Sequence, residues 1–298
     1  MHTVSVAAAS SSPAIDRGSS SASSDTAALD RVALLVEFRA TVNELRSRCE
    51  REALAFTEHD CLAFLRAVKN EQPRANMRTL VDAAFKRLRS TAAWRTTMKL
   101  DLCMLDDFWL AQELEYRKLL LYDIIGHDAS GRPVLVERCG AWDIEAVLAS
   151  AESDPQRFAT LHCMVQERMR RQARPAGCCD PYGTVIIIDL AGLSTHHLKH
   201  ARAIAKVFIT LARLDTAHYP DSLSCLFIVN APTIFAVLAG LVRPFLPEAT
   251  LSKLHVARGV PDALIQTTGR EVLPSALGGA RQCFPYHIPF YASAVEVT

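Results

Sequence analysis

The sequence predicts an α/β protein in which a small N-terminal helical lobe precedes a mostly parallel β-sheet covered by helices. The sheet is indicated by Thr184–Leu190 (TVIIIDL), a continuous β-branched run that is typical of a strand covered on both faces. Apolar runs and helical periodicities then alternate up to residue 257, and buried strands joined by helices favour right-handed crossovers and parallel pairing. The lobe is indicated by helical spacing of apolar residues in the first hundred positions.

The composition limits the classes of protein that are possible. The chain has 298 residues, 50% of them hydrophobic, so it can bury a large core in one or two domains. The net charge of +1 gives no overall field toward nucleic acid, and we expect no nucleic-acid partner. Nine cysteines without a CxxC pair indicate buried thiols in a reducing cytosol.

Neither a membrane span nor a signal peptide is expected. The longest apolar run, Leu226–Val242, is interrupted by Asn230 and Pro232, and a bilayer requires roughly 20 apolar residues. The N-terminus is rich in Ser and Ala and has no apolar signal-peptide core. We therefore expect a soluble protein of the cytoplasm.

The first hundred residues divide into a tail and a lobe. Residues 1–27 lack the large apolar side chains that offset the entropy of ordering, which predicts a disordered Ser/Ala-rich tail. The helical lobe is predicted over residues 28–100. Its helices are expected at Ala28–Leu45, at Glu58–Val68 with Thr57 as the N-cap, and at Arg74–Trp94, whose basic side we interpret as a solvated face.

Residues 101–280 form the predicted α/β domain, and residues 281–298 form a C-terminal extension. Two apolar runs, Leu119–Ile125 and Val134–Val136, flank a turn-rich joint. The predicted helices are Trp142–Ser150, Pro155–Gln172 and Leu198–Leu214, and the predicted strands are Thr184–Leu190, Leu223–Val229 and a last one near Lys253–Ala257.

Thr233–Val242 is the most unusual stretch of the chain. Its ten residues carry no charge, and it is expected to be helical after Pro232 although it is apolar on nearly every side. A helix that is hydrophobic all round is either fully buried or faces something other than water. Both interpretations stay open from this pattern.

The sequence motifs do not indicate an enzyme. No phosphate-binding glycine loop follows a predicted strand. Ser194 lies just after a strand, but the strained turn of a hydrolase nucleophile needs a glycine where His196 stands. We therefore interpret Ser194 as a turn or N-cap residue, expect no enzyme, and keep a serine hydrolase as an alternative.

A metal site is also not expected. His196 and His200 have the i, i+4 spacing that brings two imidazoles to one helix face. No HExxH glutamate lies between them, and no third ligand is evident from the sequence. The expectation is a protein without metal or cofactor.

Charged residues border the apolar stretch. Asp221 precedes one predicted strand, Arg243 follows the apolar helix, and Lys253 opens the next strand. These positions lie near one another if the strands are neighbours. Charges at the rim of an apolar element suit a molecule with a polar headgroup and an apolar tail.

Seven motifs follow one another through the second half of the chain. They are GRPV (131–134), a helix with Arg157, Phe158, His162 and Glu167, IIIDLAG (186–192), YPDSL (219–223), FIVNAP (227–232), RPFLPEATLSK (243–253) and LPSALGG (273–279). In this order and spacing they resemble the CRAL-TRIO lipid-binding family. Upstream, CLAFLRAVK (61–69) resembles the helical domain that precedes CRAL-TRIO in the phosphatidylinositol/phosphatidylcholine transfer proteins.

The resemblance implies a helical lobe packed on an α/β lobe, whose sheet floors an apolar lipid pocket closed by a mobile helix at Thr233–Val242. In members that bind phosphatidylinositol, a base of the FLR motif, an acid after YP and a base before PFL contribute to the headgroup site. The matching residues here are Arg66, Asp221 and Arg243, and the polar candidates for a phosphatidylcholine headgroup are Thr184 and Tyr219.

A soluble carrier must enclose its lipid, because each acyl methylene exposed to water costs roughly 0.8 kcal/mol. The mobile helix must be apolar on both faces, since its inner face meets acyl chains when shut and its outer face meets the bilayer when open. A buried core helix remains the alternative. The residues expected to form the gate and the acyl pocket are Phe235, Leu238, Leu241, Val242, Ile186, Ile188 and Phe227.

We therefore expect a monomeric protein that binds one phospholipid, of the phosphatidylinositol or phosphatidylcholine type, and exchanges it during transient, peripheral contact with membranes. Two further functions stay open. One is binding of another hydrophobic ligand, such as a sterol, tocopherol or retinoid. The other is a signalling or scaffold module whose pocket is incidental.

Overall fold

The computed structural model describes residues 39–172 and 183–282. Within these residues a five-stranded sheet runs in the order β1-β2-β3-β4-β5. β1 and β2 are antiparallel, and the other neighbours pair in parallel, which confirms the predicted α/β class with a mostly parallel sheet. The strands are β1 (Tyr122–His127), β2 (Pro133–Glu137), β3 (Thr184–Asp189), β4 (Leu223–Val229) and β5 (Leu254–Val256).

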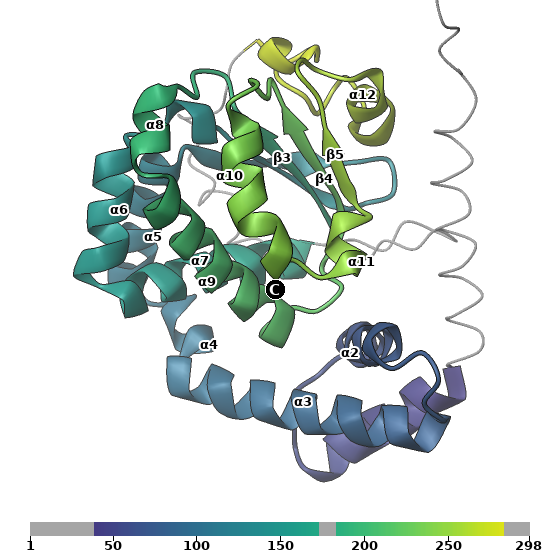
Figure 1. Ribbon diagram of the computed structural model, residues 1–298. Helices are drawn as coiled ribbons and strands as arrows, with labels where there is room; N and C mark the ends of the chain where they lie inside the picture. The colour runs from purple at the N-terminus through teal and green to yellow at the C-terminus, as the bar shows by residue number, and fades with distance from the viewer. Residues whose placement is uncertain (1–38, 173–182, 283–298) are drawn as a thin grey trace, which may run out of the picture.

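Helices connect the parallel strands, and α10 crosses in front of the sheet beside α9 (Figure 1). Helix α12 packs on the opposite face of the sheet, where Leu264 joins a cluster with Ile187 and Phe227. The helices of this part are α4 (Leu100–Cys103), α5 (Asp107–Leu120), α6 (Ile144–Ser153), α7 (Pro155–Gln172), α8 (Thr195–Lys199), α9 (Ala201–His218), α10 (Phe235–Val242), α11 (Glu248–Leu251) and α12 (Asp262–Thr268), with 3-10 turns η1 (Cys139–Ala141), η2 (Arg243–Phe245) and η3 (Ser275–Leu277).

The N-terminal lobe lies below the sheet in Figure 1 and has its own core. It contains a helix over residues 39–51, α2 (Glu58–Glu71) and α3 (Met77–Met98). Thr57 caps α2 as predicted, in a reciprocal capping box with Asp60. The predicted Arg74–Trp94 helix starts later because the side chain of Asn76 caps it.

The elements of the α/β domain agree with most of the predicted boundaries. Helix α7 coincides with the predicted Pro155–Gln172, and Oδ1 of Asp154 accepts a hydrogen bond from the backbone N–H of Arg157 at 2.9 Å. The predicted Leu198–Leu214 helix is divided at His200 into α8 and α9. Helix α5 is not predicted from the sequence, and Leu119 is expected to begin an apolar run that ends at Ile125. Leu119 instead lies in the last turn of α5, which ends at Leu120, and the left-handed Leu121 terminates that helix.

Several expectations lie outside the described residues. These are the tail over residues 1–27, the start of the first helix from Ala28, and all but the first two residues of the extension 281–298. The division of the chain between residues 100 and 101 stays a prediction. Two regions of this fold are candidates for a functional site. One is the boundary between the lobe and the sheet, and the other is the face of the sheet beneath α10.

Candidate functional site

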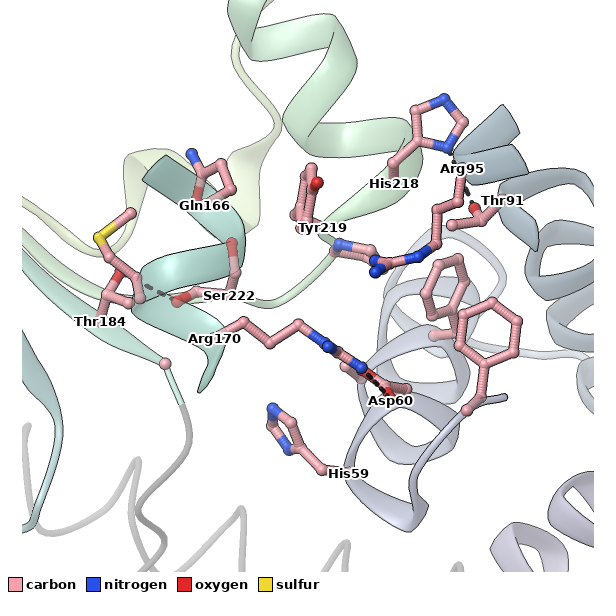
Figure 2. Close-up of a pocket in the computed structure, with 16 residues that line it drawn as sticks. His59, Asp60, Thr91, Arg95, Gln166, Arg170, Thr184, His218, Tyr219 and Ser222 are labelled. Atoms are coloured by element: carbon pink, nitrogen blue, oxygen red, sulfur yellow. Dashed lines mark hydrogen bonds and ion pairs between the residues drawn. The ribbon is translucent and has the colours of Figure 1, made fainter. Parts of the chain in front are cut away.

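A pocket of about 50 Å³ lies between the helical lobe and the α/β domain. α2, α3 and α7 form its walls, together with the end of α9 and the start of β3 (Figure 2). This volume has room for about three or four water molecules, so it is too small for a lipid. Thr184 and Tyr219, the two polar residues that the sequence analysis selects, both line it.

An ion pair across this pocket joins the two lobes. Nε and Nη2 of Arg170, on α7, donate to the two carboxylate oxygens of Asp60, on α2, at 2.9 and 2.7 Å (Figure 2). Burial alone raises the pKa of Asp60, but the guanidinium of Arg170 and the capping bonds from Thr57 outweigh it and hold the pKa below its usual value. The parallel fork of the contact fixes the orientation of both side chains.

A second buried carboxylate, Glu167 on α7, pairs with the guanidinium of Arg95, which also lines the pocket. Its side chain is fully buried, and Arg95 of α3 donates to both of its oxygens. Arg95 also contacts the exposed Asp101 at 3.2 Å. Of these four residues, only Glu167 belongs to one of the sequence motifs, and Asp60, Arg95 and Arg170 are not predicted as site residues. The available signal is the i, i+3 spacing of Glu167 and Arg170 in α7.

The predicted headgroup residues are only partly brought together. Nη1 of Arg66 lies 3.2 Å from Oδ2 of Asp221, and Nζ of Lys253 lies 2.9 Å from Oδ1 of the same carboxylate. Lys253 also donates to the carbonyl of Leu223 at 2.6 Å. Among the described residues no ion pair joins Arg243 to Asp221. Arg243 begins η2 and is exposed, whereas Lys253 joins Arg66 as a cation that pairs with Asp221.

The two faces of the sheet are packed differently. On β3, Val185 and Ile187 are 0% exposed and contact the cluster beneath α12. Their neighbours Ile186 and Ile188 point to the other face and stay partly accessible. Phe227 pairs with Ile187 and is 1% exposed in the α12 cluster. The expected grouping of Phe227 with Ile186 and Ile188 is therefore corrected, because adjacent strand positions alternate between faces.

Helix α10 covers the accessible face of the sheet and is apolar on both of its own sides. Leu238 is 8% exposed and packs on α6 and α9, and Phe235 is half-buried beside it. Val237 and Leu241 point outward with 54% and 36% exposure, and Val242 is half-buried at the end of the helix. Within residues 39–172 and 183–282, no helix has both the length and the apolar character needed to cross a membrane.

A polar group that the sequence analysis misses lies on the inner face of the sheet. Glu137 ends β2 opposite Ile188, so the two share the accessible face. Burial raises the pKa of Glu137 to about 7, with a smaller opposing effect from His162. Burial alone lowers the pKa of His162, but Asp215, whose Oδ1 lies 2.9 Å from Nε2, raises it overall. A carboxyl with a pKa near 7 can donate or accept a hydrogen bond at neutral pH.

Ser194 has the structural role that the sequence analysis prefers. It is the N-cap of α8, and its backbone N–H donates to Nδ1 of His197 at 3.2 Å. The hydroxyl of Ser194 lies 3.3 Å from the same nitrogen. Because the backbone already donates to Nδ1, this nitrogen is engaged in the cap, and the geometry favours a capping histidine over a general base.

The fold and the site define a two-lobed α/β protein with a partly accessible sheet face beneath an apolar helix. Comparison with known proteins matches a CRAL/TRIO domain over residues 118–279, more than half of the chain. The chain belongs to the CRAL/TRIO domain family. The crystal structure of Sfh5 superposes with a TM-score of 0.55 at 15% identity, over 88% of this chain and 89% of that one, which supports the fold alone.

Curated relatives match at modest identity. "Protein real-time" from Anopheles gambiae is 27% identical over 243 residues, 80% of this chain and 34% of that protein. "Phosphatidylinositol/phosphatidylcholine transfer protein SFH11" from Arabidopsis thaliana is 29% identical over 196 residues, 64% of this chain and 50% of that protein. The chain thus spans about a third to a half of the length of these relatives.

Proposed function

We propose that this protein binds a single phospholipid, of the phosphatidylinositol or phosphatidylcholine type, beneath α10 and exchanges it at membranes. The observation that carries the proposal is the uneven packing of the sheet. One face is sealed by α12, whereas Ile186 and Ile188 on the other face keep accessible surface beneath helices. Membership of the CRAL/TRIO family and a relative named as a phospholipid transfer protein support the same reading.

Helix α10 acts as the gate in this proposal. Leu238 and Phe235 face the interior and meet acyl chains when the gate is shut, while Val237 and Leu241 already face outward. Removing acyl chains from water stabilises the bound state by roughly 0.8 kcal/mol per methylene. The outward apolar side chains lower the free energy of contact with a bilayer, so the open gate is favoured at a membrane and the shut gate in water.

The headgroup lies at the rim where the lobe meets the sheet. Arg66 and Lys253 hold Asp221 between them, in the turn that directly follows the pocket residues Tyr219 and Pro220. Arg243, at the end of the gate, supplies a further exposed cation for an acidic headgroup. The protein carries out no covalent chemistry, acts as a monomer and is a cytoplasmic protein that contacts membranes peripherally.

Mass spectrometry of lipid extracted from the purified full chain tests this function, together with transfer of labelled phosphatidylinositol and phosphatidylcholine between vesicles. We expect one co-purified phospholipid and measurable transfer of at least one of the two. A sterol, tocopherol or retinoid in the extract would overturn the phospholipid assignment. An extract without lipid, combined with no transfer, would overturn the carrier function and favour a scaffold role.

A further inference from the structure

We propose that Glu145, His196 and His200 form a binding site for a divalent transition metal, with Zn²⁺ as the natural probe. Oε1 of Glu145 lies 3.8 Å from Nε2 of His196 and 3.8 Å from Nε2 of His200. The three ligand atoms all lie within 4.8 Å of one another. His196 and His200 are the i, i+4 pair for which no third ligand is evident from the sequence. In the fold, α6 supplies a third ligand, Glu145.

The distances suit the size of a zinc site. Zn²⁺ binds imidazole nitrogen at 2.0–2.1 Å and carboxylate oxygen at 2.0–2.2 Å, so two ligand atoms of a tetrahedral site lie about 3.3 Å apart. The separations found between Glu145 and each histidine exceed this value by about half an ångström. Small side-chain rotations close that gap, because Glu145 and His196 are exposed and His200 is half-buried.

The ligand set also decides the kind of metal. Two imidazoles and one carboxylate suit Zn²⁺ and its neighbours in the transition series, whereas Mg²⁺ and Ca²⁺ prefer all-oxygen sites. Three protein ligands leave a fourth position for water or for a group from outside. The alternative is a surface contact between Glu145 and one of the two histidines. That interpretation does not require both imidazoles to converge on one oxygen.

A bound metal would join two elements that support α10. Glu145 lies on α6, while His196 and His200 lie on α8 and at its junction with α9. α6 and α9 also carry the apolar cluster that holds Leu238, through residues such as Ile144 and Ile204. The metal would therefore brace the surface on which α10 rests, and this holds whether or not the proposed lipid function is correct.

Calorimetric titration of the purified full chain with ZnCl₂, and separately with MgCl₂, tests the site. Because the chain has nine cysteines, and thiolates are also metal ligands, the readout is the difference between variants. Glu145→Gln and His200→Ala should each abolish one binding event or weaken it at least tenfold, since even outer-shell changes cost 10–100-fold. Matched controls are Glu152→Gln on the same helix and His255→Ala on β5, both exposed, and these should bind as the wild type does.

Two results would overturn the site. One is an unchanged zinc isotherm in both Glu145→Gln and His200→Ala, with circular dichroism confirming that at least one of them is folded. The other is equally strong binding of Mg²⁺ by the wild type, which would indicate a carboxylate surface without nitrogen ligands. Slower amide hydrogen exchange in α6 and at the start of α9 on adding Zn²⁺ is expected in the wild type and not in Glu145→Gln.

Discussion

Nη1 of Arg66 lies 3.2 Å from Oδ2 of Asp221, although the two residues are 155 positions apart in the sequence. Arg66 belongs to the helical lobe and Asp221 to the turn before β4, so this pair joins the lobe to the sheet. The side chains are 4% and 13% exposed. Asp221 also has a left-handed backbone with φ of 54°, a conformation that Asp and Asn tolerate better than most residues.

Asp221→Asn should lower the free energy of unfolding by about 3 kcal/mol, because it leaves a buried guanidinium without its carboxylate. Asn keeps the size and the left-handed backbone, so the change isolates the charge. Urea denaturation measures the difference. Asp82→Asn removes a carboxylate from an exposed pair with Arg48 and should cost less than about 1 kcal/mol. Equal effects of the two variants would contradict the structural role of Asp221.

Arg243→Glu should leave the free energy of unfolding within about 0.5 kcal/mol of the wild type, because the side chain is exposed. In vesicle transfer, it should reduce phosphatidylinositol movement several-fold more than phosphatidylcholine movement, since the reversed charge repels an acidic headgroup. Equal loss of both lipids would refute a headgroup role for Arg243.

Val237→Asp should reduce binding to lipid vesicles several-fold in a flotation assay without unfolding the protein. Val237 is 54% exposed on the outer side of α10, and a carboxylate there is expelled from the apolar part of a bilayer. Val256→Asp is the matched control, because Val256 is 52% exposed on β5. The gate assignment fails if both variants bind vesicles equally.

His218 should make the fold less stable as the pH falls. Burial, with a smaller effect from Arg87, lowers the pKa of His218 to about 4, while the unfolded chain has a value of about 6.5. Between these values the unfolded state binds more protons, so stability falls by up to about 1.4 kcal/mol per pH unit as the pH drops from 6.5 to 4. His218→Phe keeps an aromatic ring to stack on Trp94 and should flatten this slope in urea denaturation series.

His162 should change the stability of the fold with pH in the opposite direction to His218. Its pKa is raised overall by the pair with Asp215, so it contributes stability that is fully present below the unfolded pKa of about 6.5 and is lost as the pH rises through the folded pKa. His162→Gln should therefore remove more stability at pH 5 than at pH 8. The same pH trend in His162→Gln and His218→Phe would show that these two environments are misassigned.

Much of the secondary structure could be predicted because its signals are local. Pro155–Gln172 and Leu223–Val229 were predicted at the observed boundaries, since a capped periodic helix and a short apolar run between turns depend on neighbouring residues only. Helix α5 was missed because it has exposed apolar residues such as Phe108 on more than one side, which blurs the amphipathic pattern. The division of the predicted Leu198–Leu214 helix at His200 also has no strong local signal.

The site was predictable only in part, because its contacts depend on the distances between elements. The sequence pattern selected Asp221 and Arg66 through a family resemblance, and the structure brings them together. The expected proximity of Lys253 to Asp221 is confirmed, but the pattern did not show which of Lys253 and Arg243 pairs with Asp221, because that depends on where β5 lies beside β4. Asp60 and Arg170 meet across the lobes for the same reason.

The sequence by itself determined the α/β class and the alternation of the parallel strands with helices. It also determined a helix without a polar face, at the end of the longest apolar run of the chain. Only the tertiary structure decided which side of each element faces which neighbour. Strand alternation assigns Phe227 to one of two faces, but pairing with Ile187 decides that it lies beneath α12. Glu145 becomes a third partner for His196 and His200 only because α6 packs beside α8. Local pattern sets the conformation of a segment, whereas charge partners and pocket walls depend on long-range packing that the pattern does not encode.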